Sequence, residues 1–169
     1  TYIDRATTNT GLDIGLIDNE VDAFAHEFSR KQFDKKPFSR ADRVAIFSTL
    51  GLYRGLDGDK PTWVLSYAHD AKGSKVNAAL HLAQGASFWE TKAPEMNNTT
   101  VSRRWRRKLF GWFAKHRQWF GNTRPLASVA LLYSPRARDF CPSHFKTLEA
   151  LLRRFAEAGV TSRVLPLRS

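Results

Sequence analysis

Aromatic and acidic side chains come together where two apolar runs of the sequence end. Tyr67 closes the first run and His69 follows it, whereas Trp89 closes the second run and Glu90 follows it. An aromatic ring can stack on the apolar face of a pyranose, and a carboxyl group can serve as acid, base or nucleophile at a glycosidic bond. The combination predicts a carbohydrate site in which Tyr67, His69 and Trp89 bind the substrate and Glu90 is catalytic.

A third cluster of the same kind follows the short apolar segment 12–17. Asp18 and Glu20 flank an asparagine there. Glycosidases use two carboxyl groups that lie about 5–10 Å apart, so Asp18, Glu20 and Glu90 are the catalytic candidates. The alternative interpretation is structural: Trp89 packs beneath a loop and Glu90 is only solvated.

Other reaction chemistries find little support in the residue pattern. The sequence has no glycine-rich phosphate-binding motif, and its five histidines lack the spacing of metal ligands. The single cysteine, Cys141, has no evident base partner in the sequence and excludes an intrachain disulfide. We therefore expect no cofactor and no bound metal ion.

The elements that must position these residues alternate between strand and helix in the first hundred residues. Expected strands are 12–17, 62–67 and 86–89, and expected helices are 21–28, 40–53 and 74–84. Helical spacing of Val21, Phe24, Ala25 and Phe28 supports the first helix. The apolar stripe expected to face the core from the third helix is Val76, Ala79, Leu80, Leu82 and Ala83. A strand, a helix and a strand in succession predict parallel strands joined by a right-handed crossover.

The C-terminal residues repeat the same order after the proline at position 125. Residues 127–133 and 160–167 are expected strands, and residues 143–158 are an expected helix. The chain is therefore predicted to be α/β, with two strand–helix–strand units. The alternative is one continuous doubly wound sheet, which would require hydrogen bonds between the two pairs of strands.

Residues 101–120 are expected to form one long helix rich in tryptophan and arginine. Trp105, Trp112 and Trp119 recur every seven residues and therefore share a narrow stripe. A buried seam between two domains is the main interpretation, and a nucleic-acid-binding face or a membrane-surface helix are the alternatives. Burial predicts that Trp112→Ala costs about 3–5 kcal/mol. The basic residues expected to face solvent are Arg103, Arg107 and Lys115.

The excess of positive over negative charge is confined to one part of the 169-residue chain. Residues 1–100 have a net charge of −1 and residues 101–169 a net charge of +12, which together give +11. Such asymmetry is typical of a nucleic-acid or membrane-surface patch, or of a piece separated from an acidic partner surface. No apolar run approaches the ~20 residues that a bilayer requires, so we expect no membrane span.

Two motifs on either side of the tryptophan-rich helix resemble bacterial glycoside hydrolases of the beta-galactosidase type. They are GASFWET at 85–91 and RPLASVALLYSPRARDF at 124–140, and the resemblance extends over residues 40–169. In that family a (β/α)8 barrel precedes a flavodoxin-like domain associated with trimerisation. The resemblance implies that KPTWVLSY at 60–67 and the strand ending at Trp89 are the last two barrel strands.

The resemblance also implies how the chain is divided and what it does. Residues 1–100 would be the C-terminal part of a barrel-like domain, 101–123 a linking helix, and 124–169 the start of a flavodoxin-like unit. A complete barrel takes about 200–250 residues, so the chain would be a fragment. A carbohydrate would be the substrate, acted on by carboxylate acid/base chemistry. A homo-oligomer and a monomer are both compatible with the sequence. The alternative is a basic module that binds nucleic acid through the 101–120 helix.

One departure from the family concerns its catalytic residues. Barrel strand seven of such enzymes carries a glutamate where this chain has Ser66 and Tyr67. Glu90 or Glu20 would then take its place, or catalysis would be absent.

Overall fold

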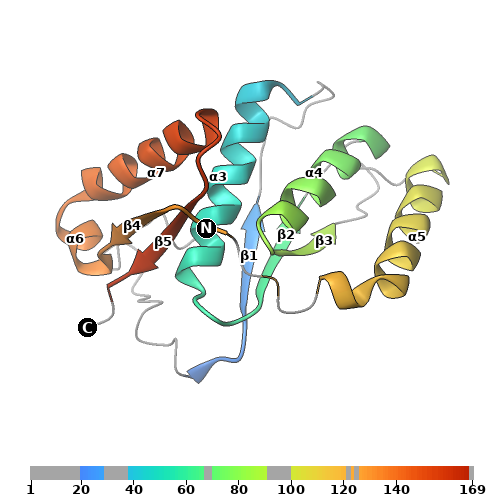
Figure 1. Ribbon diagram of the computed structural model, residues 1–169, viewed down its shortest axis with the longest axis horizontal. Helices are drawn as coiled ribbons and strands as arrows, with labels where there is room; N and C mark the ends of the chain where they lie inside the picture. Colours follow the sequence, from blue (N-terminus) through green and yellow to red (C-terminus); the bar gives the residue numbers. More distant parts are fainter. Residues whose placement is uncertain are drawn as a thin grey trace.

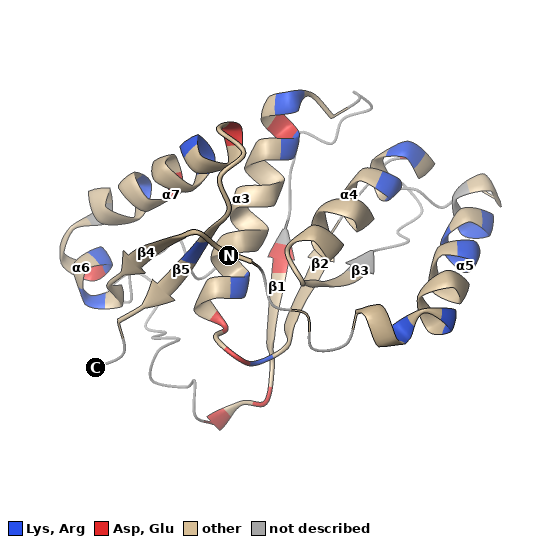
Figure 2. Cartoon of the chain, in the orientation of Figure 1, with Lys and Arg blue, Asp and Glu red and all other residues tan. Residues whose placement is uncertain are grey.

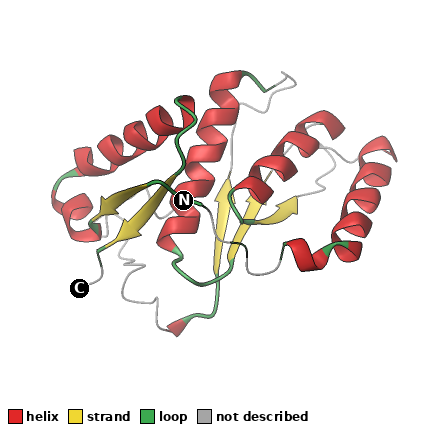
Figure 3. Cartoon of the chain, in the orientation of Figure 1, coloured by secondary structure: helices red, strands yellow, loops and turns green. Residues whose placement is uncertain are grey.

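The chain is a mixed α/β protein with two separate parallel sheets (Figures 1 and 3). A computed structural model describes residues 20–28, 38–66, 70–90, 100–120, 123 and 126–167. Three strands, β1 (Phe24–Phe28), β2 (Thr62–Ser66) and β3 (Ser87–Glu90), form the first sheet in that order. The parallel arrangement and the strands expected near 62–67 and 86–89 are confirmed.

Strand β1 corrects the prediction of a helix at 21–28. The helical spacing of Phe24 and Phe28 is also compatible with a strand, since residues four apart lie on the same side of a strand. Pairing with β2 decides between the two: Phe24 lies opposite Thr62 and Phe28 opposite Ser66. The strand expected at 12–17 lies outside the described residues.

Helix α3 (Arg40–Leu56) runs between the two sheets (Figure 1). Its first turn is fixed by a reciprocal cap, in which the Ser39 hydroxyl accepts from the Asp42 amide at 3.1 Å and the Asp42 carboxylate accepts from the Ser39 amide at 2.9 Å. Asp57 is the C-terminal cap of the helix. Gly58 then adopts a φ of 64°, which glycine tolerates because it has no Cβ.

The second sheet consists of β4 (Val129–Tyr133) and β5 (Ser162–Pro166), which are parallel. Between them run a short helix, α6 (Pro135–Phe140), and a long one, α7 (Pro142–Glu157). The expected strand–helix–strand order is confirmed. No hydrogen-bonded pairing joins the two sheets within the described ranges, so the alternative of one continuous sheet is wrong for them.

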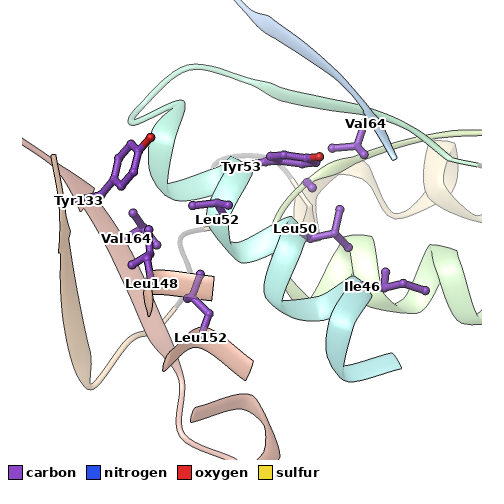
Figure 4. Close-up of a cluster of buried hydrophobic side chains, with 10 residues drawn as sticks. Ile46, Leu50, Leu52, Tyr53, Val64, Tyr133, Leu148, Leu152 and Val164 are labelled. Atoms are coloured by element: carbon purple, nitrogen blue, oxygen red, sulfur yellow. The ribbon is translucent and has the colours of Figure 1, made fainter. Parts of the chain in front are cut away.

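One hydrophobic cluster nevertheless connects both sheets through α3 (Figure 4). Leu50 and Tyr53 of α3 are buried together with Val64 of β2 on one side and Val164 of β5 on the other. Tyr133 and two leucines of α7 complete the second side. Gly55 permits the close contact of α3 with β5, because a Cβ there would lie 2.6 Å from the Val164 carbonyl oxygen.

The face that α4 (Ala71–Ala83) buries differs from the apolar stripe predicted for this segment. Its buried residues are Ser74, Asn77, Ala78 and His81, whereas Ala79 and Ala83 of the predicted stripe are exposed. A buried polar group is tolerated where it forms hydrogen bonds within the protein, and His81 Nδ1 donates to the Asn77 carbonyl at 2.7 Å. The predicted stripe is therefore wrong for Ala79 and Ala83, whereas Leu80 is partly buried against the hydrophobic core.

Helix α5 (Thr100–Lys115) is followed by a separate 3-10 turn, η3 (Arg117–Trp119), so the single helix expected over 101–120 is interrupted. Trp112 is 44% exposed, and the prediction that it is buried is wrong. The side of α5 turned toward β3 carries buried Arg106 and also Phe110, which stacks on Phe88 while 45% exposed. Trp112 follows Phe110 by two residues, about 200° around the helix.

Two consequences follow for the tryptophan stripe. The loss of about 3–5 kcal/mol expected for Trp112→Ala depended on a fully buried ring and no longer applies. The expectation that Arg103, Arg107 and Lys115 are exposed is confirmed.

Candidate functional site on the open face of the first sheet

The first sheet has one face packed against helices and one face exposed. On the packed face, the His26 ring stacks on Tyr53 of α3 with centroids 4.2 Å apart, and Val64 belongs to the core. Successive residues of a strand point to opposite faces. The other face therefore carries Ala25, Glu27 and Trp63, which are all exposed, and we call it the open sheet face.

Strand register arranges the residues of this face in two rows. The first row is Ala25, Trp63 and Ser87, and the second row, nearer the carboxyl ends of the strands, is Glu27, Leu65 and Trp89. Glu27 and Trp63 are thus diagonal neighbours, with Cα atoms about 8 Å apart by strand geometry. Trp63 is 50% exposed, so an aromatic ring and a carboxylate are accessible on the same face.

Glu27 is the candidate that sequence reasoning missed. The sequence pattern predicts a helix at 21–28, and a helix there would not place Glu27 beside the strands of the sheet. The signal that identifies it is the alternation in FAHEF, where Phe24 and His26 share one side and Ala25 and Glu27 the other. That alternation becomes decisive only when β1 pairs with β2.

The predicted residues at the carboxyl ends of the strands are partly located. The backbones of Trp89 and Glu90 belong to β3, with Glu90 opposite Ser66 of β2, but their side chains lie outside the described part. Tyr67 and His69 directly follow β2 and lie outside the described residues, as does Asp18. The register thus brings the chain position of Glu90 next to the end of β2, from which Tyr67 continues.

Glu20 lies near the amino-terminal ends of the strands. It is exposed and precedes β1, whose first residue, Phe24, pairs with the first residue of β2. Glu90 is the last residue of β3. Because the strands are parallel, the two glutamates belong to opposite ends of the strands, and the structure does not bring them together.

A buried histidine–aspartate pair occupies the packed side instead. His26 Nε2 lies 2.8 Å and 3.0 Å from the two carboxylate oxygens of Asp57, and both residues are more than nine-tenths buried. A pair of this kind can orient a catalytic base when a nucleophile is within reach. Here the His26 ring is covered by Tyr53, so the pair ties β1 to the end of α3.

A second buried histidine, His81, stays uncharged down to a lower pH than an exposed histidine would. Burial lowers the pKa of His81 to about 4, against the opposing effect of its hydrogen bond to the Asn77 carbonyl. Since a carbonyl can only accept, the His81 proton is on Nδ1 and Nε2 carries the lone pair. Its ring meets Phe88 edge to face at 5.2 Å, which makes it a packing residue behind β3.

Two further observations concern metal binding and membrane insertion. Within the described ranges, no group of three or more His, Cys, Asp or Glu residues is arranged to hold a metal ion. None of the helices described is long and apolar enough to cross a membrane. The open sheet face itself presents an exposed carboxylate, Glu27, diagonal to an exposed aromatic ring, Trp63.

Neither a protein-family model, nor a curated protein, nor a solved structure matches the chain.

Proposed function

We propose that the chain is part of a carbohydrate-active protein of the glycoside-hydrolase type, with its sugar site on the open sheet face toward the carboxyl ends of β1, β2 and β3. The observation that carries the proposal is the juxtaposition of Glu27 and Trp63 on that face. An exposed indole offers a stacking surface for a pyranose, and a neighbouring carboxylate binds hydroxyl groups or transfers a proton.

The strand order is compatible with a barrel origin for the first sheet and also with one half of a doubly wound sheet. Consecutive strands of a (β/α)8 barrel are neighbours in space, whereas doubly wound sheets reverse their order at a switch point. The sheet has the sequential order β1-β2-β3, and α3 and α4 lie between successive strands along the chain. Its open face would then line the barrel, and β4, α7 and β5 would begin the flavodoxin-like unit.

The carboxylate on the open sheet face is assigned to Glu27, with Trp63, Tyr67, His69 and Trp89 binding the sugar. Glu90 lies opposite buried Ser66 and so alternates with the row of Glu27, which leaves its catalytic role a prediction from the sequence. Glu20 has no part in this assignment because it lies near the amino-terminal ends of the strands. Hydrolysis would require a second carboxylate beside Glu27, one acting as acid and the other as base or nucleophile.

Titration of the chain with β-linked galactobiose, followed by tryptophan fluorescence, tests the proposal. Glu27→Gln should weaken binding about tenfold, because a charge-assisted hydrogen bond becomes a neutral one, and Trp63→Leu should abolish the fluorescence change. Glu20→Gln is the matched control and should bind like the parent. Equal weakening by Glu20→Gln, or no binding of galactobiose, cellobiose or xylobiose, would contradict the proposed site.

A further inference from the structure

Helix α5 carries a basic surface that the proposed sugar site does not use. Residues 100–120 contain seven lysines and arginines and no aspartate or glutamate. Figure 2 shows Lys and Arg along α5, without an acidic residue between them. All of these cations except Arg106 are exposed, so the surface attracts anions.

The exposed side of this helix alternates cations with an aromatic ring. Arg104, Lys108, Trp112 and Lys115 are all exposed and follow one another at spacings of four, four and three residues. Residues at these spacings are neighbours on a helix, and we call the four residues the outer stripe. Trp112 therefore lies between two lysines on the side turned away from Phe110 and β3.

The Trp112 ring is held in place by other aromatic rings while it stays accessible. Its centroid lies 5.0 Å from that of His116 and 5.4 Å from that of Phe120. Trp119, which is 59% exposed, meets it at 6.4 Å and stacks on His116 at 4.4 Å. An ordered, partly exposed indole loses little conformational freedom when a flat ligand stacks on it.

We propose that the outer stripe of α5 binds single-stranded nucleic acid, with phosphates on Arg104, Lys108 and Lys115 and an unpaired base stacked on Trp112. Single-strand sites combine a cationic track with aromatic stacking surfaces. A duplex fits less well because its bases are already stacked on each other.

The orientation of the helix argues against an anionic membrane as the partner. A helix that lies on a membrane turns its apolar face toward the lipid. In α5, Phe110 packs on Phe88 of β3 and Arg106 is buried, whereas the outer stripe presents three cations. The outer stripe thus presents charge instead of a continuous apolar face, although Phe110 on the other side is itself 45% exposed.

Fluorescence anisotropy of a short labelled oligothymidylate, titrated with the intact chain at low and moderate salt, tests the proposal. Binding should quench tryptophan emission and should weaken with salt by a slope of about 0.7 per phosphate contact. Arg104→Glu/Lys108→Glu should weaken binding at least about tenfold and reduce that slope. The control Arg136→Glu/Lys146→Glu makes the same change of charge at exposed positions of α6 and α7 and should have a much smaller effect.

A tryptophan pair separates stacking from general attraction and from the sugar site. Trp112→Leu should weaken oligothymidylate binding about tenfold and leave galactobiose binding unchanged, whereas Trp63→Leu should do the reverse. The proposal is overturned if phosphatidylserine vesicles or heparin bind and oligothymidylate does not, if duplex DNA binds as tightly, or if Trp112→Leu binds like the parent.

Discussion

At the scale of single residues, burial determines what a titratable group can do. His81 and His26 both lie in the interior, but their surroundings differ. His26 faces the carboxylate of Asp57, whereas His81 has a backbone carbonyl on one nitrogen and the Phe88 ring beside it. Desolvation therefore prevails at His81 and lowers its pKa from 6.5 to about 4.

This lowered pKa predicts a loss of stability on acidification. Between about pH 6.5 and about pH 4 the unfolded chain binds a proton on His81 that the folded chain does not, so the free energy of unfolding falls as the pH falls. The difference corresponds to about 3 kcal/mol by pH 4, below which both states are protonated. Urea unfolding of the parent and of His81→Gln at about pH 7 and about pH 4.5 measures the effect. The variant should lose less stability than the parent, and an equal loss in both would refute this role for His81.

At the scale of elements, contact between neighbours decides which face of a helix is buried. Helix α4 turns Ser74, Asn77 and His81 inward, and α5 turns Arg106 inward and Trp112 outward. Hydrophobicity alone does not predict that these polar residues are buried, although Leu80 of α4 does pack against the core. Helix α3 shows a tighter constraint, because at Gly55 it touches the backbone of β5.

Two glycine-to-alanine changes should have opposite effects for this reason. Alanine in a helix is favoured over glycine by about 0.5–1 kcal/mol. At Gly111 of α5 a Cβ would meet no atom within 4 Å, so Gly111→Ala should gain about that amount. At Gly55 the Cβ would lie 2.7 Å from the Val164 Cβ, and overpacking should cost about 1–3 kcal/mol. Thermal unfolding of both variants measures the difference, and a gain at Gly55 would show that α3 and β5 are farther apart.

At the scale of the whole molecule, the two sheets of the described residues are not paired with each other and still share one core. Helix α3 supplies side chains to both, with Val64 on one side and Val164 on the other. Disruption of either contact exposes the same helix. The two parts therefore depend on each other for stability, although their strands are separate.

A single cooperative unfolding transition is expected from this shared core. The five tryptophans lie between residues 63 and 119 and report on the first part. Cys141, the single cysteine of the chain, is exposed, and a fluorophore attached to it reports on the second part. Urea titrations followed by both signals should have the same midpoint. Two separate midpoints would mean that the core around α3 does not couple the sheets.

Several features of the protein were determined by the sequence itself. The positions of β2, β3, β4 and β5 follow from short apolar runs bounded by turns, and the strand–helix–strand order requires parallel pairing. The exposure of the α5 cations other than Arg106 also follows, since an arginine or lysine is rarely buried without a partner. Local residue types suffice for such features.

Tertiary structure decided the rest, including most of the candidate site. Phe24 and Phe28 fit a strand and a helix equally well, and only pairing with β2 made this segment a strand and placed Glu27 beside Trp63. The direction of Trp112 likewise depended on which side of α5 met Phe88. A periodic pattern defines a face of an element, but the neighbour that buries this face comes from elsewhere in the chain, so only the assembled fold determines which side chains remain available for function.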